Sequence, residues 1–281
     1  MTTEPIPSVT AADGLVLPLR QWPRAGARGH VLIVHGLGEH SGRYDALAAA
    51  LNEAGFAVSS HDQRGHGRTV GARGVIPAAD SLCEDLAAVL DMLAHAGTPA
   101  TVLLGHSMGG LVAARFVAEA LQPQPAAWSR PIPRLVLSSP ALATNRSRFQ
   151  LLQLALMNAI APALPVPNGL NAAWISRDPA VVRAYEADPL VHDRICARLA
   201  RFIIDGGELV RASAPRWTTP TLLMWAGADR CVAPAGSAAF AAAAPARVVQ
   251  HQEYPALAHE IFNEPERDQV IACLLRFLNE A

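Results

Sequence analysis

The sequence TVLLGHSMGGLVAARFVAEAL, residues 101–121, decides the fold. It joins a short apolar run to a helical pattern through Gly105-His106-Ser107-Met108-Gly109, which has the form G-x-S-x-G. Glycine tolerates backbone conformations that other residues avoid, so this spacing permits a tight, strained turn that exposes the serine oxygen at the top of a sheet. The stretch therefore predicts a strand, a turn and a helix, with Ser107 as a candidate nucleophile.

The rest of the chain repeats this alternation of buried strand and helix. Runs rich in Val, Ile and Leu predict strands at residues 30–35, 56–60, 101–104, 134–138, 220–225 and 247–251, with an antiparallel edge strand at 14–20. Helical patterns between such runs are typical of βαβ units. The clearest helix spans about 82 to 96, where Ser81 and Glu84 have capping-box spacing. The predicted fold class is α/β, with a mostly parallel central sheet flanked by helices.

One segment interrupts the alternation. Residues 141–212 carry no strand signal. They include an apolar stretch, LLQLALMNAIAPALPVP (151–167), and a more polar helical stretch from Asp178 to Asp205, with Pro179 placed for a first helical turn. We therefore expect a helical cap at 141–212, inserted into a core formed by 1–140 and 213–281.

A serine hydroxyl is a weak nucleophile, so Ser107 needs a base within hydrogen-bond reach and an acid that orients the base. Asp229 follows the predicted strand 220–225, and His259 follows the next one by a loop. Both lie beyond the carboxyl ends of strands, where open α/β sheets place their sites, and the order Ser, Asp, His suits this fold class. We predict that Ser107, Asp229 and His259 form a catalytic triad.

Other residues fit these roles less well. His251 lies within a predicted strand, and His106 precedes the nucleophile on the turn, so neither is well placed as the base. Asp205, in the predicted cap, is the fallback for the orienting acid. For an oxyanion hole, the architecture needs the backbone N–H after the nucleophile and one from the loop after an earlier strand, which indicates Met108 and Leu37.

Composition excludes several classes of protein. The chain is 51% hydrophobic and 17% charged, unlike disordered proteins, and its 23 basic residues, all Arg, are scattered among 24 acidic ones, so no patch predicts nucleic-acid binding. No H-E-x-x-H, zinc spacing, P-loop or G-x-G-x-x-G at a first strand occurs, so we predict no metal and no cofactor. Four distant cysteines and an amino terminus without a signal-peptide pattern indicate a cytoplasmic protein.

Three motifs together carry a family resemblance. His35-Gly36-Leu37-Gly38-Glu39-His40-Ser41-Gly42-Arg43-Tyr44, His61-Asp62-Gln63-Arg64-Gly65-His66-Gly67-Arg68 and Gly105 to Gly110 resemble the monoacylglycerol lipases and lysophospholipase-like serine hydrolases of the α/β-hydrolase fold. Ser176-Arg177-Asp178-Pro179, Tyr185 and Asp188-Pro189-Leu190 look like the cap of that family, so the resemblance extends from about residue 12 to 280.

The resemblance implies a serine esterase with an acyl-enzyme intermediate. It also implies that Glu39, Arg43, His106 and Tyr185 receive the alcohol headgroup, although an ion pair that holds the oxyanion loop explains Glu39 and Arg43 equally well. A further family histidine, three residues after the catalytic one, falls on Phe262 here, which weakens the case for glycerol as the leaving group. Asp62, Arg64 and His66 are interpreted as braces of their loop, and His35, His40 and His61 as loop-structure residues.

The function that we predict is hydrolysis of monoacylglycerols or lysophospholipid-like esters. The apolar stretch 151–166 could line an acyl site, pack against the core, or contact a membrane surface transiently. A short-chain, aryl or thioester hydrolase is the main alternative. A serine aminopeptidase, in which Glu186, Asp188 and Asp193 would hold an amine, and a binding scaffold rank lower. The sequence carries no signal for an oligomeric state.

Overall fold

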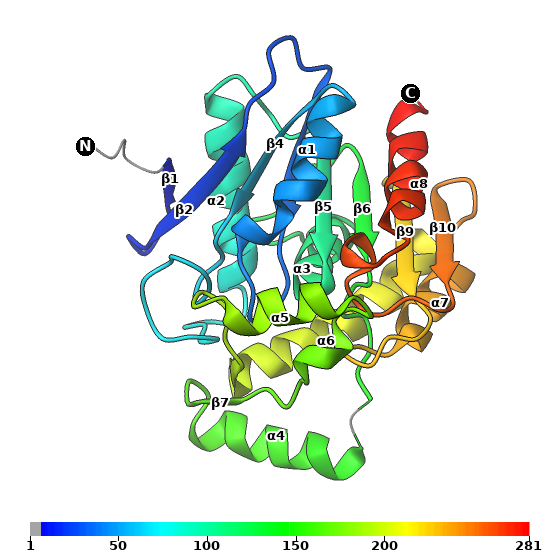
Figure 1. Ribbon diagram of the computed structural model, residues 1–281. Coiled ribbons are helices and arrows are strands. Elements are labelled where there is room, and N and C mark those ends of the chain that lie inside the picture. Colours follow the sequence, from blue (N-terminus) through cyan, green and yellow to red (C-terminus); the bar gives the residue numbers. More distant parts are fainter. Residues whose placement is uncertain (1–6, 146, 281) are drawn as a thin grey trace.

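An eight-stranded sheet runs through the centre of the computed structural model, which describes residues 7–145 and 147–280 (Figure 1). Its strands are β1 (Ser8–Thr10), β2 (Val16–Trp22), β3 (Gly29–Val34), β4 (Phe56–His61), β5 (Val102–His106), β6 (Leu135–Ser138), β9 (Thr221–Ala226) and β10 (Val249–Tyr254). Their order is β1-β2-β4-β3-β5-β6-β9-β10. Only β1 and β2 are antiparallel to their neighbours. The predicted α/β class is confirmed.

The amino-terminal edge differs from the expectation in one respect. The strand predicted at 14–20 is β2, and it pairs antiparallel with β4 as expected, but β1 covers its other side through Val9 opposite Leu17. The edge strand is therefore β1. A strand of three residues is too short to show a period-two pattern, so the sequence carries no clear signal for β1.

Helices cover both faces of the sheet. The helices α1 (Asp45–Glu53) and α8 (Arg267–Asn279) pack on one face, and α2 (Ser81–His95), α3 (Ser107–Ala120), α6 (Ala197–Ser213) and α7 (Pro234–Ala243) on the other (Figure 1). Strand β3 shows why two cores form. Val31 and Ile33 pack in the core on the face of α1 and α8, and Leu32 and Val34 pack in the core on the opposite face. Successive side chains of a strand point to opposite faces, so a fully apolar strand supplies both cores.

The predicted capping box at Ser81 and Glu84 is wrong. Helix α2 begins at Ser81, after Asp80, so Ser81 lies inside the helix. Its hydroxyl accepts a hydrogen bond from Ala78 N at 3.1 Å instead. A capping box does form at the start of α4, between Ser147 and Gln150.

The segment 141–212 differs from the strand-free helical stretch that was expected. It contains α4 (Arg148–Ile160), β7 (Pro165–Pro167), α5 (Pro179–Ala187), β8 (Arg194–Cys196) and α6, and β7 pairs antiparallel with β8. The helical stretch predicted from Asp178 to Asp205 breaks after α5, where Asp188 is extended with φ −80° and ψ 116°. Pro189 causes this break, because the residue before a proline is pushed out of the helical region.

Helix α5 starts as predicted. Pro179 occupies its first turn, and the Asp178 side chain caps it by accepting a hydrogen bond from Ala180 N at 2.8 Å. Helix α4 lies at the outer end of the segment, beyond α5 and α6 (Figure 1). In the ranges 7–145 and 147–280, no helix is long and apolar enough to cross a membrane.

Candidate active site

The turn between β5 and α3 holds Ser107 in a strained conformation. Its φ is 53°, in the left-handed region that few residues other than glycine adopt. The flanking glycines allow this turn to sit against the sheet. A Cβ on Gly109 would lie 2.1 Å from Val34 O, and one on Gly105 would lie 2.4 Å from Gly109 O. Both contacts are impossible for a real side chain, so the G-x-S-x-G spacing is a steric requirement of this site.

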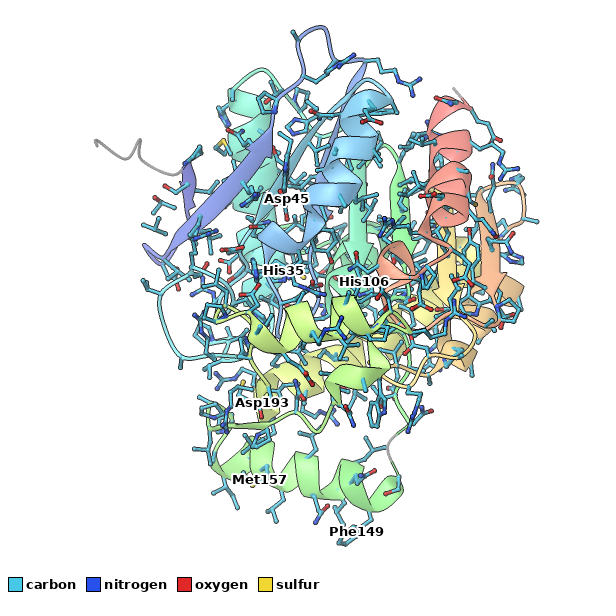
Figure 2. All side chains as sticks on the ribbon, viewed as in Figure 1. His35, Asp45, His106, Phe149, Met157 and Asp193 are labelled. Carbon is cyan, nitrogen blue, oxygen red and sulfur yellow. The ribbon has the colours of Figure 1, made fainter. Side chains whose placement is uncertain are left out.

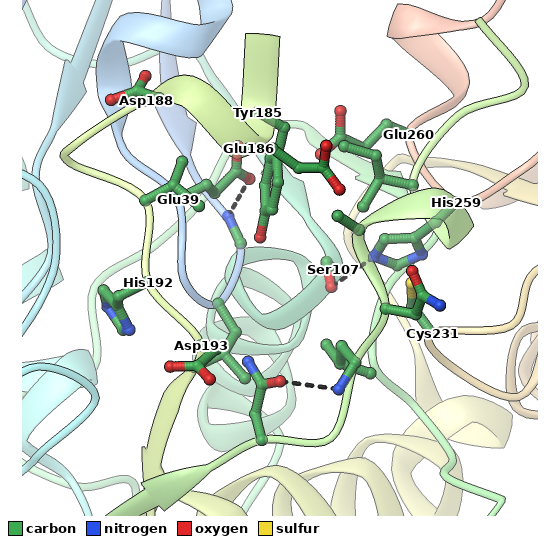
Figure 3. Close-up of a pocket in the computed structure, with 18 of the residues that line it drawn as sticks. Glu39, Ser107, Tyr185, Glu186, Asp188, His192, Asp193, Cys231, His259 and Glu260 are labelled. Atoms are coloured by element: carbon green, nitrogen blue, oxygen red, sulfur yellow. Dashed lines mark hydrogen bonds between the residues drawn. The ribbon is translucent and has the colours of Figure 1, made fainter. Parts of the chain in front are cut away.

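The three residues predicted as a triad meet at this turn. Ser107 Oγ lies 2.8 Å from His259 Nε2 (Figure 3), and His259 Nδ1 lies 2.6 Å from Asp229 Oδ2. Asp229 follows β9, and its Oδ1 accepts hydrogen bonds from Cys231 N at 2.8 Å and Val232 N at 3.0 Å. All three side chains are buried. The structure thus brings together a hydroxyl, an imidazole and an oriented carboxylate in one hydrogen-bonded chain.

The surroundings of His259 favour its protonated form. Burial alone would lower the pKa of His259, but the charge and hydrogen bond of Asp229, with smaller contributions from Glu260 and Glu39, raise it above its ordinary value. The neighbouring His106 differs, because burial lowers its pKa to about 4. A proton that leaves Ser107 is therefore held by His259 rather than by His106.

Asp229, Cys231 and His259 form the one group of three candidate metal ligands in the described part of the chain, with ligand atoms within 4.8 Å of one another. Both Asp229 oxygens and both ring nitrogens of His259 already have hydrogen-bond partners. Burial raises the pKa of Cys231, which disfavours the thiolate that a metal prefers. The arrangement suits proton transfer better than metal binding.

The loop after β3 carries one predicted oxyanion donor. Leu37 lies between Gly36 and Gly38 and borders the cavities beside Ser107. Met108, the other predicted donor, lies in the first turn of α3, where backbone N–H groups have no partner within the helix. Gly38 has φ 79°, and a Cβ there would lie 2.4 Å from His192 O, so the loop is closely packed against the segment 188–193.

The predicted headgroup residues Glu39 and Arg43 belong to a buried ion cluster behind this loop. Glu39 accepts hydrogen bonds from Gly36 N at 2.6 Å, from the Tyr44 hydroxyl at 2.8 Å and from Arg43 at 2.8 Å. Burial would raise the pKa of Glu39, but the charges of Arg43 and nearby histidines and the Gly36 N–H lower it to about 2. The Glu39 carboxylate is therefore ionised and fully engaged by protein groups.

Arg43 also binds Glu260, through two hydrogen bonds of 2.6 and 2.7 Å. Glu260 follows His259 directly, so this pair ties the loop that carries His259 to the segment after β3 that carries Arg43. Glu260 has no motif signal in the sequence other than its position next to His259. Arg43 lies under the ring of Tyr185, 4.7 Å from its centroid, and is not among the described residues that line the cavities at Ser107.

Glu39, His106 and Tyr185 do line the larger cavity, which has a volume of about 330 Å³ and opens beside Ser107 (Figure 3). A smaller cavity of about 80 Å³ shares Leu37 and Ser107 with the larger one and includes Met108 in its wall. Three of the four predicted headgroup residues are thus at the cavity wall, and Arg43 supports them from behind.

The remaining candidates lie away from Ser107. Asp205 is on α6, where it pairs with Arg201, and His251 is exposed on β10. Phe262 is buried in the core on the face of α1 and α8. The fallback acid and the rival base therefore do not reach the serine.

The loop after β4 is braced as predicted. Asp62 accepts hydrogen bonds from Ser41 and from Arg68 N, and Arg64 pairs with Asp13 and Asp85. His66 Nδ1 lies 2.9 Å from Arg64 O.

His35 binds across to the same loop, accepting a hydrogen bond from Gln63 N at 2.9 Å. His40 reaches the segment 141–212 through Asp188, at 2.8 Å. His61 is fully buried, and burial lowers its pKa to about 3. These histidines shape the loops around the site.

Comparison with known proteins agrees with this geometry. The family described as serine aminopeptidase, S33, matches residues 25–266. A monoacylglycerol lipase of Mycolicibacterium smegmatis is 35% identical over 270 residues, covering 94% of this chain and 93% of that protein. A phospholipase of Bacillus subtilis is 31% identical over 253 residues, covering 89% of this chain and 95% of that protein.

A solved structure agrees as well. The crystal structure of a monoacylglycerol lipase from Paleococcus ferrophilus superposes with a TM-score of 0.82 at 34% identity, covering 93% of this chain and 98% of that chain. The predicted resemblance is confirmed over nearly the whole sequence. The chain belongs to the serine aminopeptidase S33 family of α/β-hydrolases, and within it to the carboxylic ester hydrolases that include the monoacylglycerol lipases.

Proposed function

We propose that this protein hydrolyses monoacylglycerols by a serine esterase mechanism, with Ser107, Asp229 and His259 as its catalytic triad. The observation that carries the proposal is the continuous chain of short hydrogen bonds from Asp229 through His259 to Ser107, which ends on a strained turn that faces a cavity. The similarity to monoacylglycerol lipases of two organisms supports the substrate class.

In the first half of the reaction, Ser107 Oγ attacks the ester carbonyl carbon and His259 Nε2 takes the hydroxyl proton. The Asp229 carboxylate stabilises the imidazolium that forms. His259 then gives the proton to the departing alcohol oxygen, which leaves an acyl ester on Ser107. In the second half, water attacks this ester, His259 takes its proton, and the fatty acid departs as Ser107 regains its hydrogen.

Negative charge develops on the carbonyl oxygen during both attacks. We assign its stabilisation to the backbone N–H groups of Leu37, in the loop after β3, and of Met108, the residue after Ser107. Each such donor typically contributes ~2.7–4 kcal/mol to the transition state. Because Glu39 binds Gly36 N, the ion cluster would keep the loop that carries Leu37 in place.

Residues 141–212 would act as a cap over a core formed by 1–140 and 213–281. This division is supported by the cavity walls, because Tyr185, Asp188 and Val191 reach the larger cavity from the cap side, whereas Ser107 and His259 come from the core. The cap would enclose the substrate and exclude water from the acyl-enzyme.

The outer surface of the cap suits transient contact with a lipid surface. Phe149, Leu152 and Ile160 are 67%, 68% and 72% exposed on α4, and Figure 2 shows Phe149 projecting away from the rest of the molecule. Apolar side chains on one exposed helix favour the membrane interface. We expect the wild-type protein to sediment with phosphatidylcholine vesicles and the double variant Phe149→Ser/Leu152→Ser to remain in the supernatant. In the control, Val70→Ser, an equally exposed residue outside the cap is changed. No sedimentation of the wild type would refute this contact.

We also place the protein in the cytoplasm. Cys83, Cys196, Cys231 and Cys273 are all free, which is typical of a reducing compartment. Fractionation of the source cells tests this location, and recovery outside the cytoplasmic fraction would contradict it.

The first experiment measures fatty acid release from monoacylglycerols of increasing chain length, beside short-chain esters of a chromogenic alcohol. We expect activity on the monoacylglycerols that Ser107→Ala abolishes. In the matched control, Ser129→Ala, the serine lies in the loop after α3 and should keep full activity. Cleavage of short activated esters alone would support the short-chain esterase alternative instead.

A serine aminopeptidase is the second candidate. Glu186, Asp188 and Asp193 line the larger cavity, where carboxylates could hold a substrate amine. Release of β-naphthylamine from aminoacyl β-naphthylamides, absent in Ser107→Ala, would support this activity.

A further inference from the structure

Two cavities of different character meet at Ser107. They share Leu37, Ser107, Asn168, Leu170 and Cys231 in their walls. None of the described residues that line the smaller cavity is charged, and Met108, Ile195, Ala200 and Ile203 are among them. An acyl chain suits such a wall, because apolar surface gains most by leaving water there. The alcohol portion of an ester attacked by Ser107 then lies in the larger cavity.

The wall of the larger cavity is strongly acidic. Five carboxylates line it, all labelled in Figure 3: Glu39, Glu186, Asp188, Asp193 and Glu260. No arginine is present among the described lining residues. Burial lowers the pKa of both His106 and His192 to about 4, so these two wall histidines are neutral near pH 7.

The cations behind this wall are already paired. Arg43 is held by Glu39 and Glu260, so one guanidinium serves two carboxylates. Arg194 pairs with Asp193 at 3.0 Å.

The side chain of Glu186 is exposed, and it makes no hydrogen bond or ion pair with any residue in the described ranges. Figure 3 shows it beside Tyr185 in the wall of the larger cavity. Its charge is therefore not compensated within the wall.

We propose that the larger cavity selects esters by the charge of their alcohol, admitting neutral and cationic alcohols and excluding those that carry phosphate or carboxylate. This inference rests on the proposed ester hydrolysis and narrows its substrate class to esters without an anionic headgroup. An anion there would face a wall in which five carboxylates outnumber the two guanidinium groups, Arg43 and Arg194, that pair with them, and this excess of negative charge opposes its binding. An alcohol with hydroxyl groups can instead donate a hydrogen bond to the Glu186 carboxylate, which no group in the described part of the chain engages.

Three esters with the same acyl chain test the proposal: 1-octanoylglycerol, octanoylcholine and 1-octanoylglycerol 3-phosphate. Octanoic acid release is measured below the aggregation concentration of each ester. We expect kcat/KM for the phosphate ester to be at least about 100-fold below that for the glycerol ester at low ionic strength, with a smaller difference in added salt. We expect the choline ester to be cleaved at least as well as the glycerol ester. A phosphate ester cleaved within about threefold of the glycerol ester would overturn the inference while leaving the esterase mechanism intact.

A pair of variants identifies the source of the selectivity. Glu186→Gln should raise the ratio of phosphate-ester to glycerol-ester kcat/KM at least about fivefold. Glu208→Gln removes the same charge from an exposed position on α6 outside the cavity wall and should leave the ratio unchanged. Equal ratios in the two variants and the wild type would overturn the assignment to the wall. If the wild type cleaves none of the three esters, the proposed function fails, and this inference fails with it.

Discussion

Glu39→Gln separates a bracing role of the Glu39 carboxylate from direct contact with substrate. Oε1 accepts the hydrogen bonds from Gly36 N and from the Tyr44 hydroxyl, whereas Oε2 accepts the one from Arg43. A glutamine whose Oε1 keeps the first two bonds must turn its amide nitrogen, a donor, toward the guanidinium, which is also a donor. The substitution therefore breaks the ion pair with Arg43 and keeps the contact with Gly36 N, which holds the loop that carries the proposed oxyanion donor Leu37.

The expected destabilisation follows from the hydrogen bonds that Glu39→Gln loses and keeps. Losing one hydrogen bond to a charged group costs about 1.5–3 kcal/mol, and removing one partner of a buried ion pair costs about 3–5 kcal/mol. Arg43 keeps its two bonds to Glu260, so we expect a loss of about 2–3 kcal/mol in the free energy of unfolding and little change in kcat. Glu39→Ala also releases Gly36 N, so we expect a larger loss of stability and a kcat lowered by up to about 10²-fold.

The stability difference should depend on pH. The pKa of Glu39 falls from 4.5 to about 2 in the folded protein, so its ionised form stabilises the fold above pH 4.5, and this stabilisation is lost as pH falls through about 2. The unfolding free energies of wild type and Glu39→Gln should therefore converge over that range.

Urea unfolding measures the stability, and initial rates on a monoacylglycerol give kcat and KM. The control is Asp45→Asn, because the ion pair of Asp45 with Arg20 leaves side chains 55% and 37% exposed and should contribute no more than about 1 kcal/mol. If Glu39→Gln unfolds within about 0.5 kcal/mol of wild type and changes only KM, the carboxylate contacts substrate and the bracing argument is wrong.

Asp229→Asn should lower kcat by about 10⁴-fold without lowering the melting temperature by more than a few degrees, and near-normal activity would exclude Asp229 as the orienting acid. His259 must be neutral to accept the proton and its pKa is raised above 6.5, so kcat/KM should fall as pH falls through that pKa. Glu260→Gln removes one of the negative charges that raise the pKa of His259, so it should move this acidic limb of the kcat/KM profile to lower pH. An acidic limb that does not move would contradict the influence of Glu260 on His259. Gly109→Ala should prevent stable folding, because its Cβ would lie 2.1 Å from Val34 O, whereas Gly206→Ala on α6, with its nearest contact at 3.4 Å, should retain a normal melting curve. Ala200→Phe should fill the smaller cavity and reduce kcat/KM for long acyl chains about fourfold for each methylene that is displaced. The control Ala212→Phe, exposed on the same helix, should leave the dependence of kcat/KM on chain length unchanged. The same dependence in both variants would show that the acyl chain does not bind in the smaller cavity.

The sequence by itself determined the class of fold and the residues of the predicted triad. Strands buried on both faces are continuous apolar runs, so residues 31–34 and 102–104 could be assigned without knowledge of their neighbours. The turn at Ser107 could also be predicted from the sequence, because only glycine fits positions 105 and 109. Asp229 and His259 followed from their places just beyond strand ends, since parallel strands bring those ends to one edge of the sheet. Local pattern and chain order were sufficient for each of these assignments.

Tertiary structure alone decided the rest. Strand β1 and the β7–β8 pair are short segments whose conformation depends on distant partners, so they leave little periodic signal. The pairing of Arg43 with Glu260 joins residues 217 positions apart, and it showed that Arg43 lies behind the cavity wall rather than in it. The acidic wall likewise combines residues of the segment 141–212 with residues from outside it. The sequence gives the charge of each side chain, but whether an opposite charge compensates it depends on which side chains the fold places beside it.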